Sequence, residues 1–109
     1  MTDVKKLIEI LNAETINFSE NREITTGYCG DFLSFVISKA PVGAAWFTVM
    51  SNVNVAAVAL LAEVPAVVLC EGVKPDEGLS ARCKAEGINL ISTELDAYGA
   101  SVILGNEIK

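Results

Sequence analysis

The stretch AAWFTVMSNVNVAAVALLAEVPAVVLC, residues 44–70, decides the fold. Residues 44–50 form an apolar run with a single hydroxyl, which is typical of a strand buried on both faces. Residues 51–62 begin with residues that favour helix caps and continue with valine, alanine and leucine, so we expect a helix there. Residues 66–70, after a proline, form a second apolar run. Two buried strands joined by a helix predict a crossover between parallel strands.

The same alternation extends outward to both ends of the chain. Before this stretch we expect a helix capped by Thr2 or Asp3 and ended by Asn12, strands at 15–18 and 23–29, and a helix opened and capped by Asp31. After it we expect a helix from Pro75 to Gly87 and a strand at 88–91. We also expect a last helix that begins with a capping box at Thr93 and Asp96 and ends before Gly105. This pattern predicts one α/β domain of three layers, residues 1–109, with helices on both faces of a mainly parallel sheet.

Composition excludes several classes of function. The chain has 14 acidic and eight basic residues and a net charge of −6, with no basic cluster, which disfavours nucleic-acid binding. It has no histidine, so neither a Ser-His-Asp triad nor a histidine-ligated metal can form within one chain. Its three cysteines, Cys29, Cys70 and Cys83, contain no C-x-x-C pair. We expect no metal site, no cofactor and reduced thiols.

Nothing in the sequence predicts contact with a membrane. The most apolar segment, residues 53–70, is interrupted by Asn54, Glu63 and Pro65, and is too short to span a bilayer. The first residues contain no signal-peptide core. We therefore expect a cytoplasmic protein.

Two stretches resemble a known family. Residues 21–34, NREITTGYCGDFLS, resemble the signature of the DRTGG domain, which is related to the N-terminal domain of HPr kinase/phosphorylase. Residues 86–95, EGINLISTEL, are similar to the ending of the same domain, whereas Asn21 stands where the family usually has aspartate. The resemblance covers nearly the whole chain. It implies an α/β regulatory domain, here in a stand-alone form, of the kind that otherwise accompanies CBS pairs, phosphotransacetylase or HPr kinase.

We expect no catalysis. Phosphoryl transfer of the HPr kinase type requires a G-x-x-x-x-G-K-[ST] loop around the phosphates, and no glycine here precedes Lys-Ser or Lys-Thr. Cys29 has no base in the chain to activate it and is interpreted as a packed thiol, and Cys70 and Cys83 as core residues. The regulatory hypothesis is the sensing of a small ligand, such as a nucleotide or a phosphorylated metabolite. The alternative is a protein–protein adaptor or dimerisation module without such a ligand.

Candidate ligand-binding residues follow from where parallel strands end. In open α/β sheets ligands bind beyond the carboxyl ends of the strands, beside helix N-termini. The candidates in those positions are Gly27, Tyr28, Gly30, Asp31, Ser51, Asn52, Asn54, Gly72, Ser92 and Thr93. Glycines allow close approach, Tyr28 offers a stacking face, and the neutral amides and hydroxyls suit a base or sugar. Each segment also fits a simple cap or turn. Arg22 is interpreted as a surface ion-pair residue or an anion ligand.

The helix at 52–62 suggests a homodimer. Residues 40–62 contain no charge, and this helix is apolar on nearly every side. We expect Val53, Ala56, Ala57, Leu60 and Leu61 to face the sheet, with Val55 and Val58 behind them. A contact through Val55, Val58 and the small Ala56, Ala57 and Ala59 would bury the remaining stripe. The alternatives are a helix wedged beneath the N-terminal helix, or a different partner protein.

Overall fold

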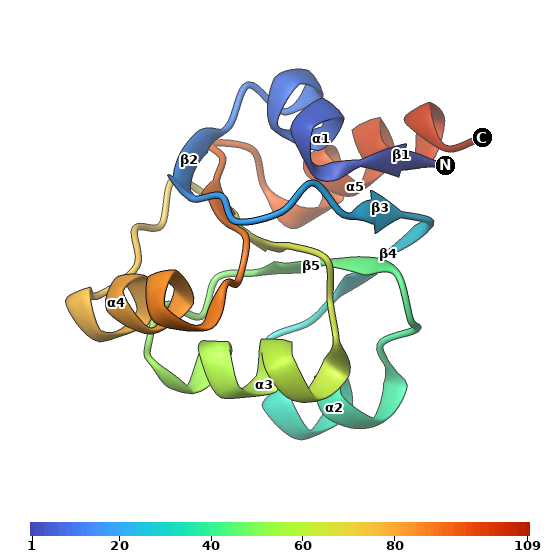
Figure 1. The fold of residues 1–109 in the computed structure, drawn as a ribbon. Helices are drawn as coiled ribbons and strands as arrows, with labels where there is room; N and C mark the ends of the chain where they lie inside the picture. Colours follow the sequence, from blue (N-terminus) through green and yellow to red (C-terminus); the bar gives the residue numbers. More distant parts are fainter.

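Five strands form the main sheet, in the order β2–β7–β6–β5–β4 (Figure 1). The computed structural model describes all residues, 1–109. The strands are β2 (Glu14–Asn17), β4 (Thr26–Cys29), β5 (Ala44–Thr48), β6 (Val67–Leu69) and β7 (Leu90–Ser92). Strands β4 to β7 are parallel, and β2 runs antiparallel to β7. The mainly parallel sheet is thus confirmed.

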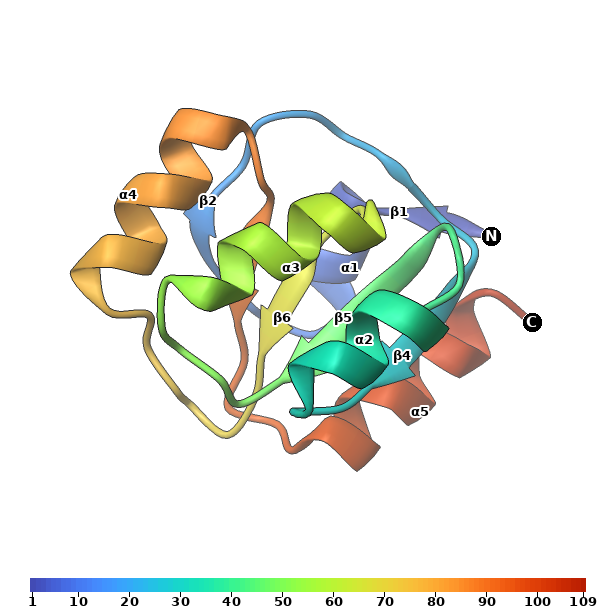
Figure 2. The ribbon, with the colours of Figure 1, turned by 90° about the horizontal axis from the view of Figure 1, so that it is seen from below.

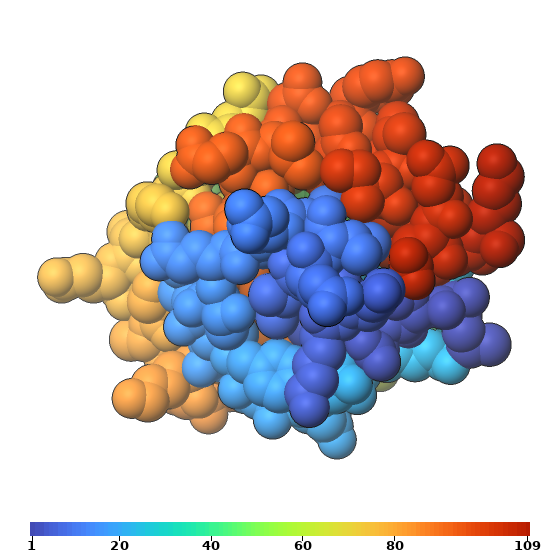
Figure 3. Space-filling model, turned by 90° about the horizontal axis from the view of Figure 1, so that it is seen from above, coloured from blue at the N-terminus to red at the C-terminus, as the bar shows by residue number.

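Five helices cover both faces of the sheet. The helices α2 (Leu33–Lys39), α3 (Asn54–Ala62) and α4 (Glu77–Glu86) lie side by side on one face (Figure 2). The helices α1 (Val4–Ile10) and α5 (Ala97–Glu107) cover the other face. Seen from above, the N-terminal segment lies against the C-terminal helix (Figure 3). The three-layer architecture is confirmed. No helix has the length and apolar character needed to cross a membrane.

A short ribbon was not predicted. The strand β1 (Thr2–Asp3) pairs antiparallel with β3 (Glu23–Ile24), and this pairing ties the start of the chain to the segment before β4. The strand predicted at residues 23–29 is therefore divided at Thr25 between two sheets. Its first half pairs with β1 and its second half pairs with β5.

The two layers of helices enclose two separate apolar cores. Trp46 lies in the core beneath α2, α3 and α4, whereas Phe47 lies in the core beneath α1 and α5. Both side chains are fully buried. Because successive side chains of a strand point to opposite faces, a strand covered on both faces must be apolar throughout. The apolar run at residues 44–47 has this cause.

Acidic side chains cap three of the helices. Asp3 accepts from the N–H of Lys6 at the start of α1, and Asp76 accepts from Leu79 at the start of α4. Asp96 caps α5 through Gly99, so the capping box predicted at Thr93 is wrong. The end predicted before Gly105 is also wrong: the helix continues to Glu107, and Gly105 does not take the positive φ that ends a helix.

The orientation predicted for α3 is wrong. The buried side chains are Val55, Ala56, Val58, Ala59 and Ala62, whereas Leu60 is 41% and Leu61 is 68% exposed. The helix lies between α2 and α4, not beneath α1, and its neighbours cover most of its circumference. A helix that is apolar all round carries no pattern that indicates its buried side. The valines assigned to a dimer contact belong to this chain's own core.

Arg22 forms no ion pair, contrary to the prediction. Its guanidinium crosses to the end of α3 and donates to the carbonyl oxygens of Val64 (2.9 Å) and Glu63 (3.2 Å). Glu63 takes the left-handed conformation there, with φ 55°. A cation favours the partly negative C-terminus of a helix. Arg22 therefore closes the C-terminal end of α3.

Candidate functional site

The predicted ligand segments do meet at one edge of the molecule. Residues 27–31 end β4 and lead into α2, residues 51–54 follow β5, Gly72 follows β6, and residues 92–93 end β7. Since these four strands are parallel, their carboxyl ends lie along one edge of the sheet. We call this edge the carboxyl edge.

Asp31 connects the loops after β4 and β5. Its carboxylate accepts from the hydroxyl of Thr48 (2.6 Å) and from the backbone N–H of Val49 (2.9 Å). It does not cap α2, whose N-cap is Phe32 without any side-chain hydrogen bond. The prediction of Asp31 as a helix cap is therefore wrong, because the end of β5 offers its carboxylate two donors.

The segment after β5 leaves polar groups free. The backbone carbonyl of Ser51 accepts from the N–H of Asp76 (3.0 Å), which joins this loop to the start of α4. Asn52 accepts from the N–H of Asn54 (2.9 Å) and so supports the first turn of α3. The side chain of Asn54 itself is exposed and makes no hydrogen bond within the protein. Asn54 is the candidate whose polar group is most available.

The segment that ends β7 is used by the fold. Ser92 and Thr93 are each only 3% exposed. The hydroxyl of Ser92 donates to the carbonyl of Val73 (2.8 Å), and that of Thr93 donates to the carbonyl of Leu11 (3.3 Å). Gly72 donates its N–H to the carbonyl of Thr93 (2.8 Å). The interpretation as turn residues fits this segment better than ligand binding.

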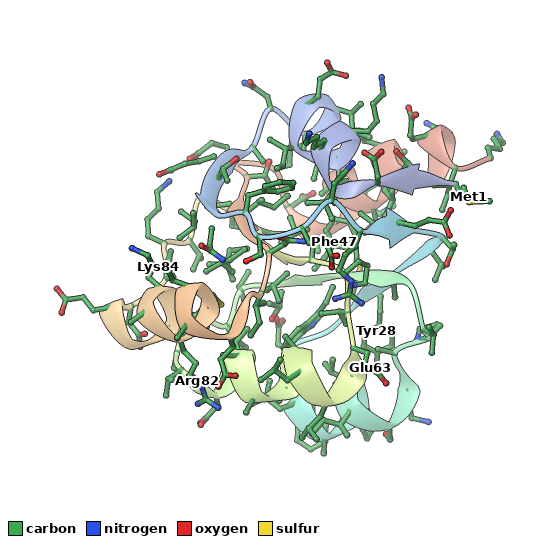
Figure 4. All side chains as sticks on the ribbon, viewed as in Figure 1. Met1, Tyr28, Phe47, Glu63, Arg82 and Lys84 are labelled. Atoms are coloured by element: carbon green, nitrogen blue, oxygen red, sulfur yellow. The ribbon has the colours of Figure 1, made fainter.

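Tyr28 and the two glycines of the β4 segment are packed at the sheet. Tyr28 is half-buried and lies on the side of α2 and α3, opposite Phe47 (Figure 4). A Cβ on Gly27 would stand 3.1 Å from the ring of Phe47, so the lack of a side chain at this position leaves room for that ring in the core beneath α5. The carbonyl of Gly30 accepts from the indole N–H of Trp46 (2.8 Å). Glycine thus serves close packing at residue 27.

The hollows of the surface are lined by few of the predicted ligand-binding residues. The largest, about 330 Å³, lies between the end of α1 and the loop after β7, and Thr93 is its one predicted residue. A second, about 170 Å³, lies between β4 and α5 and includes Gly27. The third, about 160 Å³, lies at the opposite edge beside Arg22. Only the first approaches the size of ordinary ligand pockets, about 300 Å³ and above.

The carboxyl edge is acidic. Asp31, Glu71, Asp76, Glu94 and Asp96 lie in the loops that follow β4, β6 and β7. Two of these carboxylates already accept from the free N–H groups of α4 and α5. The positive ends of those helices are therefore occupied by the chain itself. This edge has the charge of a site that repels free anions.

The cysteines are free thiols in different surroundings. Burial raises the pKa of Cys70 to about 12 and that of Cys83 to about 11, because desolvation disfavours the thiolate. Both lie in the apolar cores, which confirms their interpretation as core residues. Cys29 is exposed, contrary to its interpretation as a packed residue, and its sulfur lies 2.8 Å from the hydroxyl of Ser101. No three acidic or thiol side chains converge as metal ligands would.

A buried amide was missed by the sequence analysis. Asn89 is 2% exposed and makes hydrogen bonds with the backbone of residues 19 and 20 and with the carbonyl of Pro65. No local signal distinguishes this asparagine from a turn residue, because its partners are distant in sequence. Its role is to hold the fold together.

Neither a family model nor a curated protein matches the sequence. Among solved structures, the chain matches the CBS and DRTGG domains of the regulatory region of a Clostridium perfringens pyrophosphatase, complexed with its activator diadenosine tetraphosphate. The TM-score is 0.75 and the identity 19%, over 94% of this chain and 46% of the other. The chain has the fold of part of that regulatory region. The resemblance inferred from the sequence is thus confirmed at the level of the fold. The match spans less than half of the other chain.

Proposed function

We propose that this chain is a regulatory domain without catalysis of its own that senses a nucleotide or a phosphorylated metabolite. One observation carries the proposal: 94% of the chain shares its fold with part of the regulatory region of a pyrophosphatase, and the structure of that region contains a nucleotide activator. The sequence supports the same proposal, because it contains no histidine and no phosphate-binding loop.

We propose that the ligand binds along the carboxyl edge through its base and sugar. The available groups there are neutral: the half-buried Tyr28 ring, the Ser51 hydroxyl and the exposed Asn54 amide. Five carboxylates share this edge and would repel phosphates in direct contact. A nucleotide that places its base against the edge and its phosphates toward water avoids this repulsion.

A thermal-shift assay tests ligand sensing. Purified protein is heated with diadenosine tetraphosphate, ATP, adenosine or acetyl phosphate. A ligand at 100 times its dissociation constant adds about 2.7 kcal/mol, which is about 10 °C in melting temperature for a domain of this size. The Asn54→Ala variant is expected to lose most of the shift, and Asn106→Ala, a matched change on the exposed side of α5, is expected to retain it. If acetyl phosphate alone acts, base and sugar recognition is wrong.

The second candidate is a protein–protein module without a small ligand. The absence of a hollow at the loop after β5, together with the acidic edge, favours it. If none of the four compounds shifts the melting temperature, this candidate replaces ligand sensing. Catalytic turnover of ATP or acetyl phosphate that a single substitution abolishes would contradict both.

A further inference from the structure

The two outer edges of the sheet differ in how they are protected. Strand β2 has a bulge between Thr15 and Asn17, and its Glu14 forms an ion pair with Lys74. Bulges and charges are the usual devices that prevent an edge strand from pairing with another chain. Strand β4, with the sequence TGYC, has no charge, no proline and no bulge, and pairs only with β5. One edge is blocked and the other is open.

The backbone of β4 offers hydrogen-bonding groups to a further strand. The N–H of Gly30 donates to the carbonyl of Phe47 (3.1 Å), and Phe47 stands opposite Cys29, so in this parallel ladder Thr26 and Tyr28 direct their N–H and C=O groups toward β5. Because these groups alternate in direction along a strand, Gly27 and Cys29 direct theirs away from β5. Strand β4 can therefore accept a partner without losing its bonds to the sheet.

Exposed apolar side chains accompany this edge. Helix α2 is the outermost helix of its layer on the β4 side (Figure 2). Its Phe32 is 63% and Phe35 is 51% exposed, and their rings meet edge to face at 4.8 Å. At about 150–250 Å² for an aromatic side chain, the pair leaves about 200 Å² of apolar surface in water. This edge of the molecule therefore carries an exposed aromatic pair.

The charge distribution indicates what covers this edge. Residues 24–62 contain only two charged side chains, Asp31 and Lys39, although the chain has 22 in all. Two copies of a chain with a net charge of −6 repel each other wherever their acidic faces meet. The β4 edge with α2 is the part of the surface where a second copy meets almost no like charge.

We propose that a second copy of this chain pairs its β4 antiparallel with this β4, about a two-fold axis perpendicular to the sheet. Gly27 and Cys29 of each copy then bond the same groups of the other, as an isologous contact requires. The two Phe32–Phe35 pairs flank the paired strands. A standard interface buries about 800 Å² per partner, about one seventh of the 5518 Å² surface of this chain. This homodimer replaces the one predicted through α3, and it stands independently of ligand sensing.

Light scattering after gel filtration at micromolar concentration tests the dimer. The unmodified chain is expected to show twice the mass of one chain. Cys29→Pro removes an outward N–H that the sheet does not use and is expected to give a folded monomer. Phe35→Glu is expected to weaken association at least about tenfold, as for an aromatic hot spot. Leu61→Glu, the same change at an exposed apolar residue of α3, is the matched control and is expected to remain dimeric.

Amide hydrogen exchange keeps the test decisive if Cys29→Pro fails to fold. The amides of Gly27 and Cys29 in the unmodified chain are expected to become protected as the concentration rises through the association range. A monomeric mass for the unmodified chain overturns the proposal. So does fast exchange at both amides in a dimeric sample, or a monomer produced by Leu61→Glu and not by Phe35→Glu.

Discussion

The substitution Asn89→Asp tests the buried amide that joins three segments of the chain. Asn89 accepts from the N–H of Ser19 (2.8 Å) and donates to the carbonyls of Glu20 (2.8 Å) and Pro65 (2.9 Å). The substitution replaces the donating NH₂ with an oxygen that faces both carbonyl oxygens. Each carbonyl left without its donor costs about 1–3 kcal/mol, and the buried negative charge adds to this. We expect a loss of about 4 kcal/mol at pH 7.

Urea unfolding followed by circular dichroism measures this loss. Asn106→Asp, the same chemical change at an exposed position of α5, is the control and is expected to change stability by less than about 0.5 kcal/mol. The introduced carboxylate is disfavoured when charged, so its pKa in the folded state lies above the unfolded value of about 3.9. The loss is therefore greatest at neutral pH and shrinks as the pH falls below that folded pKa. A loss below about 1 kcal/mol at pH 7, or one that is equal at pH 4 and pH 7, would refute the reasoning.

Two further predictions concern the core. Val58→Glu is expected to lower the free energy of unfolding by more than about 4 kcal/mol and to leave the chain largely unfolded by circular dichroism, because Val58 is 5% exposed. Leu61→Glu on the same helix is expected to change stability by about 0.5 kcal/mol or less. Similar effects for both would mean that α3 is turned differently. In the native protein at pH 8, Ellman's reagent is expected to modify Cys29 alone, since burial raises the pKa of Cys70 to about 12 and of Cys83 to about 11. All three thiols are expected to react in denaturant. Simultaneous reaction of all three in the native protein would contradict the buried positions of Cys70 and Cys83.

The layers of the fold follow from signals that are local in sequence. The buried run at residues 44–48 and its counterpart at residues 67–69 predict parallel strands, because each strand must be apolar on both faces. Gly87 ends α4 as predicted, with φ 70° in the left-handed region that glycine tolerates. Such features depend on the residue and its immediate neighbours, so they can be read without the structure.

Other features depend on contacts between distant segments and leave no local pattern. The buried side of α3 is set by α2 and α4, and a helix apolar on every side does not reveal it. Arg22 was judged by its acidic neighbours, whereas its partners are carbonyls about 40 residues away. At the carboxyl edge, the sequence predicted which loops meet. It could not predict which polar groups are free, as in Asn54, and which are hydrogen-bonded, as in Ser92, because distant contacts decide this.

The antiparallel pairing of β2 with β7 has a consequence for synthesis of the chain. Thr15 stands opposite Ile91, although 75 residues separate them in sequence. The ribosome adds about 5–20 residues per second, so β2 emerges about 4–15 seconds before the strand that completes it. During that interval the apolar side of α1 has neither β7 nor α5 to pack against. We expect the nascent N-terminal segment to be a substrate for chaperones until the last quarter of the chain has been made.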